Sequence, residues 1–126
     1  MKKQFIIACI ALYLLACTAQ SDKKNNPQAE VKETFAMDHP DYAAGLALVE
    51  KSDCVSCHKI SEISVGPSYT SIAGKYENNP ENISLLTDKI IKGGQGVWGQ
   101  VPMLAHPNLA KEEAEKMVKY ILLLKP

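Results

Sequence analysis

The part of this chain that can fold is short, and that shortness constrains its architecture more than any other feature does. The segment from about Asp38 to Pro126 holds only about 89 residues, which is too few to bury a large hydrophobic core. Two long stretches within it, 59–68 and 93–107, have the character of loops, and loops of this length are uncommon in so small a domain. Something other than side chains must therefore fill the middle of the fold.

Three parts of this segment have the apolar spacing of amphipathic helices. No part of the segment has a convincing strand pattern. We expect helices over about 41–53, 82–92 and 109–124. The glycine pair after the second one predicts where it ends. The third has acidic residues in its first turns and lysines towards its end, which is the charge order that suits a helix dipole. A short helical turn is expected over 69–75.

The beginning of the chain has the pattern of an export signal. A short basic start precedes an uncharged apolar run, 5–15, which is too short to span a bilayer comfortably as a permanent helix. The run ends in Leu-Leu-Ala-Cys at 14–17, which resembles the processing box of a bacterial lipoprotein. We expect residues 1–16 to be a lipoprotein signal peptide and Cys17 to carry the lipid. Ordinary signal cleavage nearby is the alternative.

Residues 17–37 are expected to form the lipidated cysteine and a flexible tether, because they are polar, mixed in charge and without sustained periodicity. About twenty such residues span roughly 25 Å as a coil, so the domain would stay close to the membrane. Removal of 1–16 takes away Lys2 and Lys3 and leaves 14 − 2 = 12 lysines against 14 acidic residues. The mature chain is thus close to neutral, which indicates no nucleic acid partner and predicts docking that depends little on salt.

Once the signal and the anchor are set aside, Cys54 and Cys57 remain to be explained. They belong to Cys54-Val55-Ser56-Cys57-His58, the attachment pattern for haem c, in which each thiol adds to one vinyl group of a porphyrin and the histidine ligates the iron. A zinc site would need two further ligands, and a thioredoxin-like redox pair would need a βαβ context that is absent. A disulfide in an oxidising compartment is the remaining alternative.

A methionine on the far side of the iron would close the metal for electron transfer and raise its potential. Met37, Met103 and Met117 are the candidates. Met37 lies in the tether, and Met117 lies on the apolar face of the last helix, where core packing is the ordinary role. Met103 lies in a loop about 45 residues beyond the histidine, where Pro102 stiffens the backbone.

Four sequence blocks in a fixed order carry a resemblance to a known family. They are CVSCH at 54–58, VGPSY at 65–69, GQGVWGQVPM at 94–103 and VKYIL at 118–122. Through them, from about Tyr42 to Leu124, the chain resembles the small bacterial class I cytochromes c. The resemblance implies an all-α cytochrome c fold over 38–126, in which three main helices and loops wrap around one covalently bound haem c.

The resemblance also implies roles for single residues. Met103 would be the distal iron ligand, opposite His58. Pro67 would accept a hydrogen bond from Nδ1 of His58 through its carbonyl, which fixes the tautomer of the ligand. Trp98 would donate its indole N–H to a haem propionate.

Other positions bear on how closely the chain follows the family. Gly45 and Tyr120 are expected where the first and last helices cross. Gln100 and Leu104 stand where prolines are common, so the methionine loop should be more flexible, and Lys89 stands where an arginine often meets a propionate.

Three polar side chains leave a choice of role. Asn108 could hydrogen-bond near the sulfur of Met103 or cap the last helix. His39 and His106 could in principle ligate the iron, although we expect both to be exposed loop imidazoles.

The function that these features imply is one-electron transfer outside the cytoplasm, without catalytic residues. Iron would cycle between Fe(III) and Fe(II) with both ligands kept. We expect a monomer on the periplasmic side of a membrane, docking transiently with a reductase or dehydrogenase as donor and an oxidase or reductase as acceptor. The alternatives are a dedicated subunit of one dehydrogenase, a haem peroxidase or gas sensor with an open sixth site, and a non-haem lipoprotein with a Cys54–Cys57 disulfide.

Overall fold

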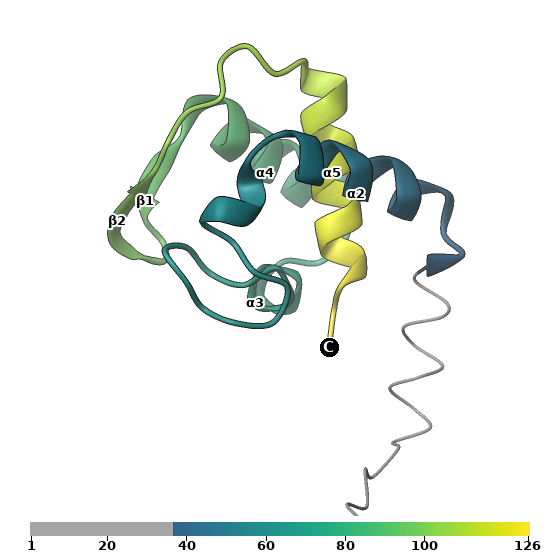
Figure 1. The fold of residues 1–126 in the computed structure, drawn as a ribbon, viewed down its shortest axis with the longest axis horizontal. Coiled ribbons are helices and arrows are strands. Elements are labelled where there is room, and N and C mark those ends of the chain that lie inside the picture. Colours follow the sequence, from purple (N-terminus) through teal and green to yellow (C-terminus); the bar gives the residue numbers. More distant parts are fainter. Residues whose placement is uncertain (1–36) are drawn as a thin grey trace, which may run out of the picture.

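A computed structural model of the chain describes residues 37–126, which form four α-helices, a short 3-10 helix and a two-stranded sheet (Figure 1). Their order is α2 (Pro40–Lys51), η1 (Cys54–Ser56), α3 (Tyr69–Lys75), α4 (Pro80–Lys92), β1 (Gly94–Gly96), β2 (Gly99–Met103) and α5 (Lys111–Leu123). Residues 1–36, with the predicted signal peptide, Cys17 and nearly all of the predicted tether, lie outside the described part. Within 37–126 no helix has the length and apolar character to cross a membrane.

The three predicted helices and the short helical turn are confirmed, with ends that differ by one or two residues. Prolines set two of the starts, because Pro40 and Pro80 occupy a first helical turn, where a missing N–H costs no hydrogen bond. The side chains of His39 and Asn79 cap these helices by accepting hydrogen bonds from first-turn N–H groups. Gly93 ends α4 with a φ of 73°, which confirms the predicted stop.

The expectation that this segment contains no strand is wrong. β1 and β2 form an antiparallel hairpin that pairs Gly94 with Met103 and Gly96 with Gly99. These three glycines have φ values of 152°, 99° and 115°, which other residues rarely adopt. The hairpin therefore lacks the alternating β-branched residues by which a strand is recognised from sequence. Residues 94–103 of the expected loop thus form this hairpin, which ends at Met103.

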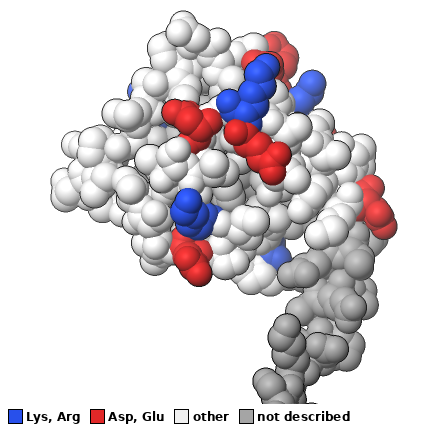
Figure 2. All heavy atoms as spheres, in the orientation of Figure 1, with Lys and Arg blue, Asp and Glu red and all other residues white. Residues whose placement is uncertain are grey.

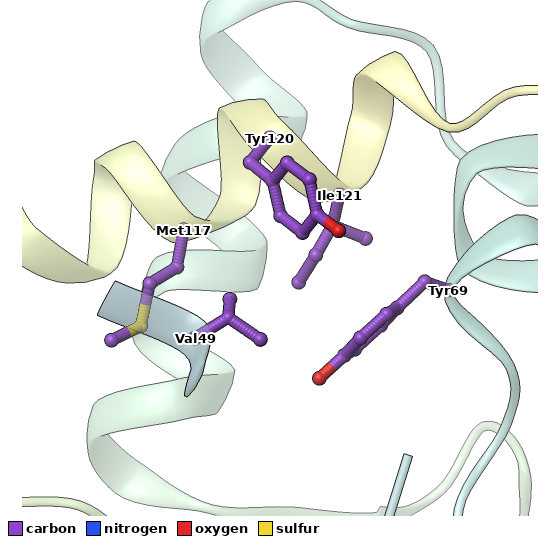
Figure 3. Packing of buried hydrophobic residues seen from close by; sticks show 5 residues of the cluster. All are labelled: Val49, Tyr69, Met117, Tyr120 and Ile121. Carbon is purple, nitrogen blue, oxygen red and sulfur yellow. The ribbon is translucent and has the colours of Figure 1, made fainter. Parts of the chain in front are cut away.

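The hydrophobic core lies where α5 packs against α2, α3 and α4. The buried cluster at its centre consists of Val49, Tyr69, Met117, Tyr120 and Ile121 (Figure 3). Met117 is fully buried there, which confirms its expected role as an ordinary core methionine. Tyr69 reaches the cluster from α3, so the core extends to the segment that follows the cysteine motif.

Gly45 allows α2 and α5 to approach closely. It is buried, and a Cβ at this position would overlap the Cβ of Tyr120 and lie 2.5 Å from the carbonyl oxygen of Lys116. The ring of Tyr42 packs edge-on against Tyr120, with centroids 5.1 Å apart. The predicted crossing of the first and last helices at Gly45 and Tyr120 is confirmed.

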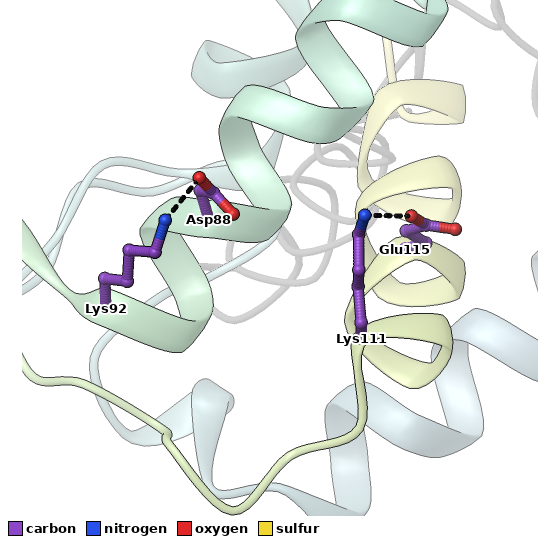
Figure 4. A network of polar contacts seen from close by, with 4 residues as sticks. All are labelled: Asp88, Lys92, Lys111 and Glu115. Atoms are coloured by element: carbon purple, nitrogen blue, oxygen red, sulfur yellow. Dashed lines mark hydrogen bonds and ion pairs between the residues drawn. The ribbon is translucent and has the colours of Figure 1, made fainter.

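The outer faces of α4 and α5 carry ion pairs between successive turns (Figure 4). Lys92 donates to Asp88 at 2.7 Å, and Lys111 lies 3.8 Å from Glu115. The hydrogen bond from Lys92 holds the pKa of the Asp88 carboxyl below its usual value. These pairs are exposed, so we expect them to add little to stability.

Candidate haem site

The cysteine motif is held in a tight turn after α2. Asp53 opens the turn with a left-handed backbone, φ 52°, and its carbonyl accepts from the N–H of Ser56 at 2.9 Å. The N–H groups of Cys57 and His58 both reach the carbonyl of Cys54, at 3.2 and 3.0 Å. This turn keeps both thiols and the imidazole close together.

No disulfide joins Cys54 to Cys57. Cys54 is half-buried and packs against the core cluster, whereas Cys57 is exposed. Burial raises the pKa of the Cys54 thiol, and the carboxylate of Asp53 adds to this effect. Across residues 37–126 no group of three or more His, Cys, Asp or Glu side chains could hold a metal ion.

A ladder of four hydrogen bonds joins residues 57–60 to residues 66–70 and holds His58 between them. The ladder consists of Gly66 N–H to Cys57 O at 2.9 Å, His58 Nδ1 to Pro67 O at 2.7 Å, Tyr69 N–H to Lys59 O at 2.9 Å and Thr70 N–H to Ile60 O at 3.0 Å. Because a carbonyl oxygen can only accept, Nδ1 of His58 carries the proton in its bond to Pro67. Nε2 is then the ring nitrogen that is left to bind a metal.

Two further residues contact the imidazole of His58. A Cβ on Gly66 would lie 2.5 Å from its Cε1, so a larger residue would displace the ring. The ring of Tyr69 stacks on it, with centroids 5.6 Å apart and planes inclined by 18°. Both residues belong with Pro67 to the block 65–69. Their place in this block is the only feature of the sequence that indicates these contacts.

Met103 is the remaining methionine candidate at the site. Met37 is exposed at the start of the described chain, and Met117 is buried in the core. Met103 is half-buried at the end of β2. Its backbone is held by pairing with Gly94 and by Gly93, where a Cβ would lie 2.6 Å from the Met103 carbonyl oxygen. In Figure 1 the hairpin that ends at Met103 lies on the same side of α5 as the loop that follows η1.

Trp98 lies in the turn between β1 and β2 and is 46% exposed. The ammonium group of Lys75, at the end of α3, lies 5.4 Å from its ring centroid, which is a cation–π contact. Lys89 on α4 also reaches the hairpin, since its Nζ lies 3.1 Å from the place of a Cβ on Gly94. Two cations thus lie close to the hairpin, where an anionic group would be favoured.

The other two histidines are not the exposed imidazoles that we expected. His39 is half-buried and caps α2, with its Nδ1 3.2 Å from a first-turn N–H. His106 is also half-buried: its Nε2 lies 3.5 Å from Oδ1 of Asp53, and its Nδ1 is buried with no hydrogen-bond partner among residues 37–126. Asn108 does not cap α5, because the cap position is Ala110 and no side chain caps it.

Large apolar side chains are exposed around these candidate ligands. They belong to η1, to the loop after His58 and to the hairpin segment, and they are Val55, Ile60, Ile63, Val65, Val97, Val101 and Leu104. Figure 2 shows no acidic or basic side chain over the hairpin, on the left of that face. Exposed apolar surface of this kind marks a contact site. The surroundings therefore fit a large apolar cofactor such as a porphyrin, with thiols to attach it.

Comparison with known proteins agrees with this site. The family model described as Cytochrome c matches residues 42–125. Cytochrome c-552 of Nitrosomonas europaea is 37% identical over 78 residues, which cover 62% of this chain and 76% of that protein. Cytochrome c2 of Rhodocyclus tenuis is 39% identical over 84 residues, with coverage of 63% and 90%.

The fold comparison points the same way. The crystal structure of wild-type Nitrosomonas europaea cytochrome c552 matches with a TM-score of 0.60 at 36% identity, covering 64% of this chain and 99% of that chain. The helices, the tight cysteine turn and the methionine hairpin described above are thus parts of a cytochrome c fold. The chain belongs to the cytochrome c family, as a small electron-transfer protein rather than an enzyme, with one haem c bound covalently through Cys54 and Cys57.

Proposed function

We propose that this protein is a one-electron carrier that works outside the cytoplasm, with its iron held by His58 and Met103. The observation that supports this most is the 2.7 Å hydrogen bond from Nδ1 of His58 to the carbonyl of Pro67. Such a bond fixes the orientation of a ligating imidazole and raises the basicity of its other nitrogen. The bound haem supplies a reversible Fe(III)/Fe(II) couple, whose potential a methionine ligand raises.

The role of the protein chain is then to hold two ligand atoms still. His58 is fixed by the hydrogen-bond ladder, and Met103 ends a paired strand. Ligands on hydrogen-bonded backbone keep their geometry better than ligands on free loops. We expect both to stay in place when the iron changes charge, which keeps the reorganisation energy small.

We further propose that Trp98 donates its indole N–H to a haem propionate. The ammonium groups of Lys75 and Lys89 lie close to the same hairpin, so a carboxylate there would be stabilised. Lys89 would then serve where the related proteins often have an arginine, with a single point charge in place of a planar fork.

The location of the carrier is proposed from the sequence. Residues 1–16 would be a signal peptide, Cys17 the lipid attachment site, and 17–37 a tether that leads to α2. The domain would be a monomer that takes electrons from a reductase or dehydrogenase and passes them to an oxidase or reductase. The near-neutral charge expected for the mature chain supports docking that depends weakly on ionic strength.

Absorption spectra of the mature haem-loaded protein test the proposed ligands. We expect a low-spin ferric spectrum with a weak band near the red end, and slow binding of carbon monoxide. Met103→Ala should give a high-spin spectrum and rapid carbon monoxide binding, whereas Met117→Leu, in the core, should leave both unchanged. An unaltered spectrum in Met103→Ala would show that another residue ligates the iron. A wild-type protein that is already high-spin would favour a peroxidase or gas sensor.

A second experiment tests the cofactor and the anchor together. A pyridine haemochrome spectrum and the intact mass of membrane-extracted protein report the thioether bonds and the acyl chains. We expect one haem and a lipid on Cys17, and Cys17→Ser should release the haem-bearing protein from the membrane. Haem-loaded protein of unlipidated mass would remove the anchor from the proposal and leave the carrier. Co-purification with one dehydrogenase would favour a dedicated subunit.

A further inference from the structure

Tyr69 lies beside the proposed iron ligand as well as in the hydrophobic core. It is the first residue of α3 and is 3% exposed. One part of its surroundings is the core cluster with Val49 and Tyr120. The other is the imidazole of His58, whose plane is inclined by 18° to the phenol ring at a centroid distance of 5.6 Å. Offset stacking at such distances is a favoured arrangement of flat rings.

The backbone fixes this stacking. The N–H of Tyr69 donates to Lys59, the residue that follows His58, at 2.9 Å. Ser68, directly before Tyr69, is buried and accepts from the N–H of Ser71 at 3.1 Å, so the start of α3 is fixed as well. The backbone of Tyr69 therefore cannot move away from His58 unless part of the ladder breaks.

Hydrogen bonding alone leaves one motion of the imidazole open. The bond from Nδ1 of His58 to Pro67 fixes the direction of one ring atom, and hydrogen bonds tolerate a broad range of acceptor geometry. Rotation of the ring about that direction is opposed by neighbours that touch the ring itself. Gly66 lies close to Cε1 of the imidazole, and the ring of Tyr69 lies against its face.

We propose that Tyr69 is a positioning residue whose ring sets the plane of the His58 imidazole at the iron. This inference rests on the proposed ligation of iron by His58. The plane of an axial imidazole governs how unpaired electron density is distributed over the porphyrin in the ferric state. Tyr69 would therefore act on the electronic structure of the haem through His58, without itself being a ligand.

The hydroxyl of Tyr69 can be separated from its ring. It is buried with no hydrogen-bond partner among residues 37–126, so it plays no visible part in holding the imidazole. Tyr69→Phe keeps the ring and removes this hydroxyl. Tyr69→Leu and Tyr69→Met both remove the flat ring, and methionine does so with a side chain that adapts to irregular gaps.

The test uses the full haem-loaded protein in the ferric state. Proton NMR gives the order and spread of the haem-methyl resonances, and electron paramagnetic resonance gives the largest g value. We expect Tyr69→Phe to keep the wild-type order and g value, and Tyr69→Leu and Tyr69→Met to change both. Val49→Ala is the matched control, because it weakens the same core cluster outside the ladder, and it should lower stability without changing either spectrum.

Two results would overturn the inference. One is a wild-type order of methyl resonances in Tyr69→Leu or Tyr69→Met, and the other is an equal change in Val49→Ala. If neither ringless variant retained haem, Tyr69→Phe would decide: an altered order would refute the role of the ring, and an unaltered order would support it. Failure of the proposed function is distinct, because it would appear as a wild-type protein without a low-spin histidine-ligated iron.

Discussion

Replacement of Gly45 by alanine tests whether close packing of α2 on α5 holds the domain together. The new methyl group would meet the Cβ of Tyr120 and the carbonyl oxygen of Lys116, the latter at 2.5 Å. One neighbour is backbone and the other is the first side-chain atom of a buried residue, so neither can turn away. The helices must separate for the alanine to fit.

The size of the effect follows from two opposed contributions. Alanine is better than glycine inside a helix by about 1 kcal/mol. Overpacking typically costs about 1–3 kcal/mol, and the immobile neighbours place Gly45→Ala near the upper end of that range. We therefore expect a net loss of about 2 kcal/mol. In a domain of this size about 1 kcal/mol moves Tm by roughly 4–8 °C, so Tm should fall by roughly 8–16 °C.

Thermal unfolding of the haem-loaded proteins, followed by far-UV circular dichroism, measures this loss. Gly74→Ala is the matched control, because Gly74 lies in α3 and has no atom within 4 Å of the place of a Cβ. That variant should gain up to about 1 kcal/mol from helix propensity alone. A Gly45→Ala protein as stable as the wild type, beside a stabilised Gly74→Ala protein, would refute the tight crossing.

Three further changes probe single contacts. Gly66→Ala should push the imidazole of His58 away from Pro67, so NMR of the reduced protein should show faster exchange of its Nδ1 proton; unchanged exchange would contradict the close contact. The depressed pKa of Asp88 adds stability that is present above pH 3.8 and is lost as the pH falls through the pKa of the folded protein. Lys92→Met should raise this pKa towards 3.8 in an NMR titration, and an unchanged pKa would exclude the ion pair as its cause. Burial raises the pKa of Tyr120 from 10.0 to about 12, which adds stability below pH 10 that is lost between pH 10 and 12. Denaturant unfolding at pH 9 and about 11 should show that Tyr120→Phe loses less stability over this interval than the wild type does.

The helices could be predicted from sequence because their signals are local. Apolar spacing, prolines in first turns and the glycine after α4 all act within a few residues. The crossing at Gly45 and Tyr120 was predictable for another reason, since it depended on the resemblance to class I cytochromes c. The role of Cys54 and Cys57 in haem attachment was predicted from a motif whose chemistry requires a fixed spacing.

The hairpin and the surroundings of His58 could not be predicted in the same way. Three of the eight strand residues are glycines in unusual backbone conformations, and the strands lack the alternating pattern by which a strand is recognised from sequence. The contact between Tyr69 and His58 depends on bonds between 57–60 and 66–70 across an irregular loop. Such bonds join residues on the two sides of a loop, so no periodic pattern in the sequence indicates them. The same holds for His106, whose contact with Asp53 joins two loops.

The ladder separates the part of the loop that holds the ligand from the part that faces outward. Its bonds lie on both sides of residues 61–65, so the backbone beside His58 is fixed independently of the loop tip. The tip itself carries Ile63 and Val65, which are 81% and 57% exposed. Side chains at the tip can therefore change without altering the angle of the imidazole.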